Sequence, residues 1–116
     1  MAIFYLKNRD TLPILEVALK NSDGTAYDLT GATGWKLHVR LRSGSTISRN
    51  MVVQGPAANG VLRYTFLAAD WSDPTTPLVA GQHRMEYEVI GPGVARISFP
   101  SDSYDELRII EDLGQA

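Results

Sequence analysis

Cysteine is absent from this chain of 116 residues, and histidine occurs only twice. Without thiols the chain can form no disulfide, no cysteine-based zinc site and no thiol active site. Long apolar runs are absent as well, because none approaches the roughly 18 residues that a membrane-spanning helix needs. The apolar start from Met1 to Leu6 ends at Lys7, too early for the core of a secretory signal peptide. We therefore expect a protein that is made in a cytoplasm and does not enter a membrane.

A strong charge of either sign is also missing. Charged residues make up 21% of the chain, hydrophobic residues make up 44%, and the net charge is −2. A nucleic-acid-binding domain would usually be clearly basic, and a membrane-surface anchor would carry a cluster of lysine and arginine. The composition instead predicts a globular protein with an ordinary core and with no nucleic-acid or membrane partner. The length fits a single domain over residues 1–116.

The short motifs of common enzymes are absent too. No serine stands in a G-x-S-x-G or S-x-x-K sequence, and the chain has neither a P-loop nor a G-x-G-x-x-G sequence. The segment Gly91-Pro92-Gly93 is rich in glycine, but we interpret it as a hairpin turn between strands. His38 and His83 lack the spacing of metal ligands, and we interpret both as surface or edge residues.

Acidic residues gather near the C-terminus without forming a recognisable catalytic pair. A glycosidase needs two carboxyl groups that face a sugar across a cleft, and a domain of this size has little room for one. We interpret the group as a solvated acidic end, formed by Asp102, Asp105, Glu106, Glu111 and Asp112. The sequence therefore predicts no enzymatic activity, no catalytic residue, no cofactor and no metal site.

Alternation of apolar and polar residues is what the chain has in abundance. It is strict from Trp35 to Arg42 and recurs at 61–66 and 84–89, as in strands with one wet face. Turn signals separate these runs, and short strands with a turn every ~8–12 residues are typical of a β-sandwich. We expect the inward residues of these runs in the core, namely Trp35, Leu37, Val39, Leu41, Leu62, Tyr64, Phe66, Met85, Tyr87 and Val89.

Two connections have recognisable signals. Ser43-Gly44-Ser45 predicts a hairpin turn, with residues 46–54 as the second strand. Residues 67–71 are predicted to form at most one helical turn. The proline-rich stretch that follows, up to Ala80, is expected to be a surface loop.

The start of the chain is apolar without alternating. The residues concerned are Ile3, Phe4, Tyr5 and Leu6. This pattern fits either a buried strand or a strand that pairs with a neighbouring subunit, so residues 1–7 are a candidate contact arm. Trp71, beside the proline-rich loop, is a second candidate contact. An aromatic residue there can anchor a partner or cover the protein's own core.

One predicted strand presents a basic row to solvent. The row contains Lys36, His38, Arg40 and Arg42, whereas the strand with Arg84, Glu86 and Glu88 is mostly acidic. If the two strands are neighbours, opposite charges can pair across the sheet. If they are not, the basic row can meet an acidic partner, or it can simply face solvent. Lys36, Arg40 and Arg42 are therefore candidate interaction residues.

Several phrases, in their order along the chain, resemble a known family. They are Phe4 to Lys20, Asp23-Gly24-Thr25, Asp28 to Thr33, Gly81 to Val89, and Ile97 to Asp102. In this order they resemble small tailed-phage and prophage proteins similar to the N-terminal domain of the phage baseplate upper protein family. The resemblance covers nearly the whole chain. It implies an all-β, immunoglobulin-like antiparallel β-sandwich that joins parts of a virion and has no catalytic residues.

The resemblance leaves the place in the particle open. A tail or baseplate adaptor and a capsid decoration or cement protein both fit, with tail, baseplate or major capsid proteins as partners. We expect a homo-oligomer, a trimer in the first place, that is made in the cytoplasm of the bacterial host and resides in the virion. The alternative is a carbohydrate-binding β-sandwich module. Such a module would need a coplanar row of exposed aromatic rings, and most aromatic residues here lie at inward positions.

Overall fold

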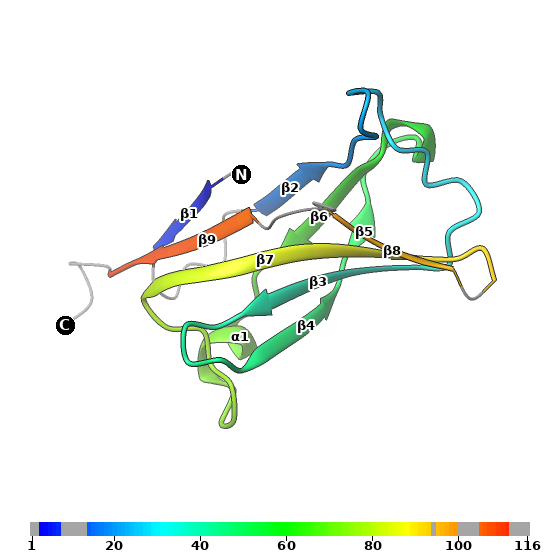
Figure 1. Cartoon of the computed structure of the whole chain (residues 1–116). Coiled ribbons are helices and arrows are strands. Elements are labelled where there is room, and N and C mark those ends of the chain that lie inside the picture. The colour runs from blue at the N-terminus through cyan, green and yellow to red at the C-terminus, as the bar shows by residue number, and fades with distance from the viewer. Residues whose placement is uncertain (1–2, 8–13, 94, 100–104, 112–116) are drawn as a thin grey trace.

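Two β-sheets make up most of the structure, a computed structural model that describes residues 3–7, 14–93, 95–99 and 105–111 (Figure 1). The larger sheet contains β1 (Ile3–Lys7), β3 (Gly34–Arg40), β4 (Thr46–Asn50), β7 (Gly81–Ile90), β8 (Arg96–Phe99) and β9 (Asp105–Ile110). The smaller sheet contains β2 (Ile14–Ala18), β5 (Val52–Val53) and β6 (Val61–Thr65). Two short helical turns complete the fold: the 3-10 turn η1 (Ala57–Asn59) connects β5 to β6, and α1 (Ala68–Ser72) lies between β6 and β7. The all-β prediction is confirmed, and α1 lies where a helical turn was predicted.

The long strand β7 organises the larger sheet, whose strand order is β1-β9-β7-β3-β4. Because β3 occupies one edge of β7, β9 and β8 share the other edge, β9 along Gly81–Met85 and β8 along Tyr87–Ile90. These pairs are antiparallel, as predicted. β1 instead pairs in parallel with β9, so the sheet is mixed. Parallel strands cannot be joined by a short hairpin. β1 and β9 need no such connection, because they come from opposite ends of the chain.

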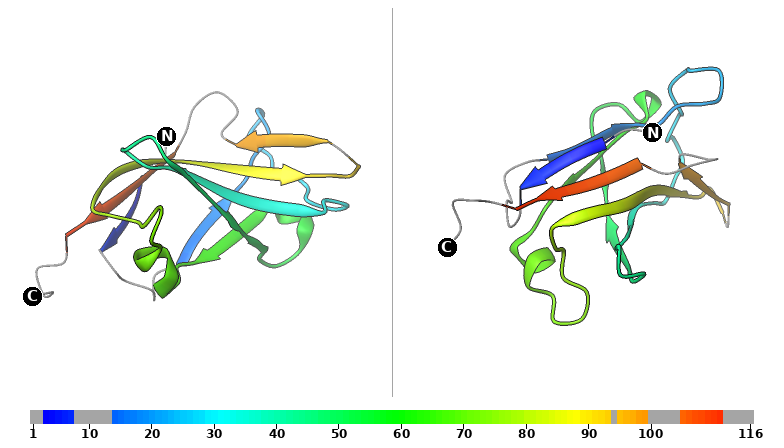
Figure 2. Two further views of the ribbon diagram at one scale, coloured as in Figure 1. Left: turned by 90° about the horizontal axis from the view of Figure 1, so that it is seen from below. Right: turned by 60° about the vertical axis from the view of Figure 1, so that its left-hand side comes forward.

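The two sheets pack face to face with the core between them (Figure 2). Alternation decides which side chains enter the core, because successive residues of a strand point to opposite faces. The predicted core residues Leu37, Val39, Leu41, Leu62, Tyr64, Phe66, Met85, Tyr87 and Val89 are all buried. Trp35 is partly buried and packs against them. Full burial of a large apolar side chain contributes about 1.5–3 kcal/mol, so this core is the main source of stability.

The run at 46–54 forms two strands and not the one that was predicted. β4 pairs with β3 as the expected hairpin, but β5 pairs with β6 in the other sheet. Between them the buried Met51 donates its backbone N–H to the carbonyl of Trp35 at 2.8 Å. The chain therefore crosses from one layer to the other at Met51. Alternation does not reveal the crossing, because both halves have strand-like sequences.

Two polar residues that were expected at the surface are buried. His83 accepts the backbone N–H of Arg42 at Nδ1 (3.1 Å) and contacts the carbonyl of Val79 through Nε2 (2.8 Å). Asp105 is also buried, and burial together with this carboxylate raises the pKa of Tyr87. Both predictions of a solvated position were wrong because burial is tolerated where polar atoms find partners. Of the other members of the acidic end, Glu111 is exposed, and Asp102 and Asp112 lie outside the described residues.

Candidate interaction surface

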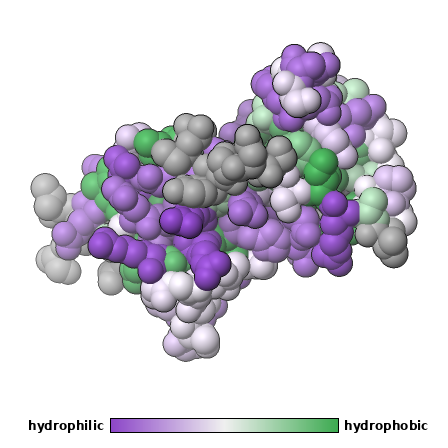
Figure 3. Space-filling view, in the orientation of Figure 1, coloured by the Kyte–Doolittle hydropathy of each residue, from purple (hydrophilic) through white to green (hydrophobic). Residues whose placement is uncertain are grey.

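The outer face of the larger sheet carries the basic row. Figure 3 views this face, and hydrophilic residues gather over β3, β7 and β9. β3 and β7 are neighbours, and their antiparallel register sets Lys36 opposite Glu88 and Arg40 opposite Arg84. The two ends of the basic row therefore face opposite kinds of charge.

Charges are matched at the Lys36 end of the row. His38 contacts Oε1 of Glu88 at 3.0 Å and the hydroxyl of Ser48 at 2.7 Å. Arg96 of β8 lies 3.5 Å from Oε2 of Glu88. The hydrogen bond with His38, assisted by Arg96, holds the pKa of Glu88 below its ordinary value. On this half of the row, His38 thus pairs with an acidic residue of the neighbouring strand, as expected if the two strands are neighbours.

At the Arg40 end, positive charges meet around an open groove of about 1020 Å³. The groove lies where β3 ends and where β7 and β9 pair, and four arginines and one glutamate line it, namely Arg40, Arg42, Arg84, Arg108 and Glu106. We call it the arginine groove. Its remaining lining includes Gln82 and the apolar residues Leu41, Ile109 and Ile110. A smaller depression of about 320 Å³ beside it shares Arg40 and Arg84.

Sheet register fixes the positions of the charged groups in the arginine groove. Glu106, Arg84 and Arg40 form one row across β9, β7 and β3. Arg108 donates from Nε to Oε2 of Glu106 at 2.6 Å, and its guanidinium lies 5.5 Å from the centre of the Tyr5 ring. The contact with Glu106 raises the pKa of Arg108. Arg108 is therefore held in place by its own sheet.

Arg40, Arg42 and Arg84 are the exposed cations of the groove, and Arg40 and Arg42 differ from Arg84 in their contacts. Within the described ranges, neither side chain takes part in an ion pair or a hydrogen bond. The backbone of Arg42 is nevertheless fixed, because its N–H is bound to the buried His83. Two guanidinium groups thus face solvent from a backbone that the core holds in place.

The candidate residues of the N-terminal segment divide between core and surface. In β1, Leu6 is buried, and Phe4 is partly buried with its ring stacked 6.1 Å from that of Phe66. Ile3 and Tyr5 alternate with them and are exposed. β1 is also the outermost strand in the order of the larger sheet. Ile3 and Tyr5 therefore remain contact candidates, whereas the side chain of Leu6 belongs to the protein's own core.

Trp71 lies in α1, the helical turn that follows β6. It is partly buried and packs against the hydrophobic core. Of the two roles expected for Trp71, anchoring a partner or covering the protein's own core, this placement corresponds to the cover. Trp71 therefore lends less support to a binding surface than the exposed residues of β1 and of the arginine groove.

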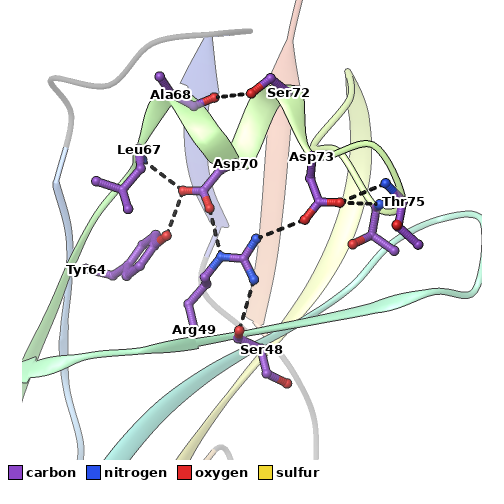
Figure 4. Close-up of polar contacts among 10 residues, drawn as sticks. Ser48, Arg49, Tyr64, Leu67, Ala68, Asp70, Ser72, Asp73 and Thr75 are labelled. Atoms are coloured by element: carbon purple, nitrogen blue, oxygen red, sulfur yellow. Dashed lines mark hydrogen bonds and ion pairs between the residues drawn. The ribbon is translucent and has the colours of Figure 1, made fainter.

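Asp70, the most deeply buried acid among the described residues, belongs to a structural network that joins α1 to both sheets (Figure 4). It accepts hydrogen bonds from the hydroxyl of Tyr64 at 2.6 Å, the N–H of Leu67 at 2.9 Å and Nε of Arg49 at 2.8 Å. Burial and the Asp70 carboxylate raise the pKa of Tyr64, and the same carboxylate raises the pKa of Arg49. Both carboxylate oxygens are engaged, so the network offers no free reactive group.

The part of the chain that the structure describes contains no group of three histidine, aspartate or glutamate side chains placed as metal ligands would be. The helical segments there are also too short to span a bilayer. The arginine groove and the outer face of β1 are therefore the surfaces that can be argued from geometry.

A similar fold occurs in a phage protein. No family model matches the sequence, and no curated protein matches it either. Among solved structures, the N-terminal domain of phage TP901-1 ORF48 matches with a TM-score of 0.58 and 14% sequence identity. The match covers 96% of this chain and 85% of that chain. The predicted likeness to a phage domain is therefore confirmed at the level of the fold.

Sequence reasoning found only half of the arginine groove. It selected Arg40 and Arg42, and the structure adds Arg84 and Arg108. Arg84 stands on a strand whose next two outward residues, Glu86 and Glu88, are acidic, and Arg108 stands alone between two inward residues. Their outward positions are visible in the alternation. The pairing of β9 with β7, which brings them beside Arg40, is not, because it joins segments that are distant in sequence.

Proposed function

We propose that this protein is a non-enzymatic structural component of a bacteriophage virion that holds neighbouring particle proteins together. The observation that carries the proposal is the fold shared with the N-terminal domain of a phage protein over 96% of this chain. The sequence phrases that resemble phage and prophage proteins point the same way.

The surface has features suited to such a role. β1 ends the larger sheet, and an end strand can accept a strand of another chain through its backbone N–H and C=O groups. Ile3, Tyr5 and Ile110 expose apolar surface on β1 and β9, close to the arginine groove. Apolar and arginine side chains together are characteristic of protein–protein interfaces.

Within the particle, we propose first a tail or baseplate adaptor. The sequence phrases resemble a baseplate family, and an adaptor needs contact surfaces and no reactive group. Capsid decoration is the alternative location, and the partner would then be the major capsid protein. The two locations predict contacts with different parts of one particle, so they can be separated by experiment.

The decisive test is to locate the chain in purified particles of the phage or prophage that encodes it. Mass spectrometry of the particles should detect the chain, and gold-labelled antibodies should mark the tail or its tip in electron micrographs. Label over the head would replace the adaptor role by the decoration role. Absence of the chain from particles that are otherwise complete would contradict a structural role in the virion.

The carbohydrate-binding alternative gains no support from the aromatic residues. Among the residues that the structure describes, Tyr5 is the one aromatic side chain that is largely exposed. Its ring is already covered in part by the guanidinium of Arg108. A sugar-binding module would need a row of several exposed rings to stack on sugars, so the described surface does not favour this function.

A further inference from the structure

We propose that the arginine groove binds an acidic segment of a neighbouring particle protein, whose carboxylates reach Arg40 and Arg42. The inference rests on the proposed function, because it names the chemistry of a partner within the virion. It concerns a surface different from the exposed edge of β1.

The first support is the local charge. The chain as a whole has a net charge of −2, yet four arginines and one glutamate line this one groove. Glu106 already contacts Arg108, so it leaves Arg40 and Arg42 uncompensated among the described residues. Guanidinium groups bind carboxylates through two parallel hydrogen bonds, which makes a carboxylate the natural partner.

The second support is an unfavourable arrangement of charges within the sheet. The register places Arg40 directly opposite Arg84 on the neighbouring strand. Like charges in directly opposed positions destabilise a sheet, whereas the same row at its other end pairs Lys36 with Glu88. Arg84 also stands opposite Glu106 on β9, whereas Arg40 stands between Arg84 and Thr46 and has no acidic residue opposite it. A bound carboxylate would give Arg40 the acidic neighbour that it lacks.

The third support is the way the groove is built. The buried His83 fixes the backbone of Arg42, and Glu106 with Tyr5 fixes Arg108. Side chains that are held before binding lose less entropy when a ligand arrives. The backbone of Arg42 and the side chain of Arg108 are therefore fixed before binding, and the side chains of Arg40 and Arg42 are the groups that a ligand would order.

The lining favours a protein segment over other anions. A volume of about 1020 Å³ with an open side is large for a single small anion. The exposed Ile110 adds apolar surface of the kind found in protein interfaces. Single-stranded nucleic acid would need aromatic rings for its bases to stack on, and Tyr5 is already engaged with Arg108. The acidic protein segment is the occupant that fits charge, size and apolar lining together.

The first test uses a fluorescein-labelled hexaglutamate peptide, with fluorescence anisotropy as the measurement. The purified full chain should bind it at low salt, and the affinity should fall as salt is raised. Arg40→Glu and Arg42→Glu should each weaken binding by about tenfold or more, because each replaces an attraction by a repulsion. Arg40→Glu should also fold as stably as the natural chain, since it places a carboxylate opposite Arg84.

The matched control is Lys20→Glu, which makes the same change in net charge at an exposed position outside the groove. It should leave the affinity unchanged within about twofold, because an exposed charge far from the ligand is screened by salt. Equal losses in Lys20→Glu and Arg40→Glu would overturn the inference, since only net charge would then matter. Tighter binding of a single-stranded DNA of six nucleotides would also overturn it.

The second test measures incorporation into particles and separates this inference from the proposed function. Particles assembled with the Arg40→Glu chain should contain markedly less of it than particles assembled with Lys20→Glu. Normal incorporation of Arg40→Glu would overturn the role of the groove while the virion role stands. Absence of the natural chain from particles would remove the virion role, and the named partner with it, even if the peptide binds.

Discussion

At the scale of single residues, Asp70 should be the most sensitive polar position. Asp70→Ala leaves Tyr64, Leu67 and Arg49 without their shared acceptor in a buried place. Removing one partner from a buried charged network typically costs about 3–5 kcal/mol. We expect a loss of this size in the free energy of unfolding, measured by urea denaturation.

The control for Asp70 is Asp73→Ala. Asp73 lies 3.8 Å from the same guanidinium and accepts the N–H groups of Thr75 and Thr76, but it is much more exposed than Asp70, so its loss should cost clearly less stability. If Asp70→Ala does not fold, Asp70→Asn keeps the volume and one acceptor oxygen, and should give an intermediate loss. Similar losses for Asp70 and Asp73 would show that the network does not stabilise the connection between α1 and the sheets.

Individual polar residues were the hardest to place from the sequence. His83 and Asp70 are buried, whereas residues of the same type at 38 and 73 are partly exposed. What separates them is a set of partners from distant segments, such as the N–H of Arg42 for His83 and the guanidinium of Arg49 for Asp70. Such partners follow from the folded arrangement and leave no local sequence signal.

At the scale of single elements, β1 has one face that packs against the core and one face that is exposed to solvent. Leu6→Ala should reduce stability by about 2–5 kcal/mol, because it leaves a cavity in the core. Tyr5→Ser should cost only about 0.5–1 kcal/mol, the value of its contact with Arg108. Thermal unfolding of the two variants measures the difference.

The same pair of variants tests whether β1 makes contacts between chains. Tyr5→Ser should lower the mass of any oligomer or the amount of protein in particles while folding is kept. Deletion of residues 1–7 would mix the two effects, because it also removes Leu6 and the only described partner on the outer side of β9. Unchanged assembly of Tyr5→Ser would exclude the outer face of β1 as a contact.

The alternation of apolar and polar residues predicted well the strands that have one solvent-exposed face, and it predicted the remaining elements poorly. The inward faces of β3, β6 and β7 were predicted correctly because polar residues mark their outward positions. β1 was ambiguous because its outward residues, Ile3 and Tyr5, are themselves apolar. The crossing at Met51 and the parallel pairing of β1 with β9 depend on contacts between distant segments, which no local pattern encodes.

At the scale of the whole molecule, acid should destabilise the fold. Hydrogen bonds from Thr25 and Thr30 lower the pKa values of Asp23 and Asp28, and the bond with His38 lowers the pKa of Glu88. A carboxyl group with a lowered pKa in the folded state stabilises it above its ordinary pKa, and this stability is lost as the pH falls. The midpoint of thermal unfolding should be nearly constant above about pH 5 and fall below about pH 4. A midpoint that rises on acidification would contradict these assignments, and Glu88→Gln should make the fall shallower.

The larger sheet also has a consequence for assembly, because its two end strands differ. β1 ends it on one side and β4 on the other, so copies that pair β1 with β4 form a head-to-tail contact. Contacts of this type generate a closed ring or an open filament, and a ring is the form that stays soluble. The trimer expected from the sequence would be a ring of three copies. Light scattering at several concentrations should then show a trimer, and Tyr5→Ser should shift it toward the monomer. A dimer would instead require the same patch on both copies, and a monomer at every concentration would mean that the chain meets its neighbours only on the particle.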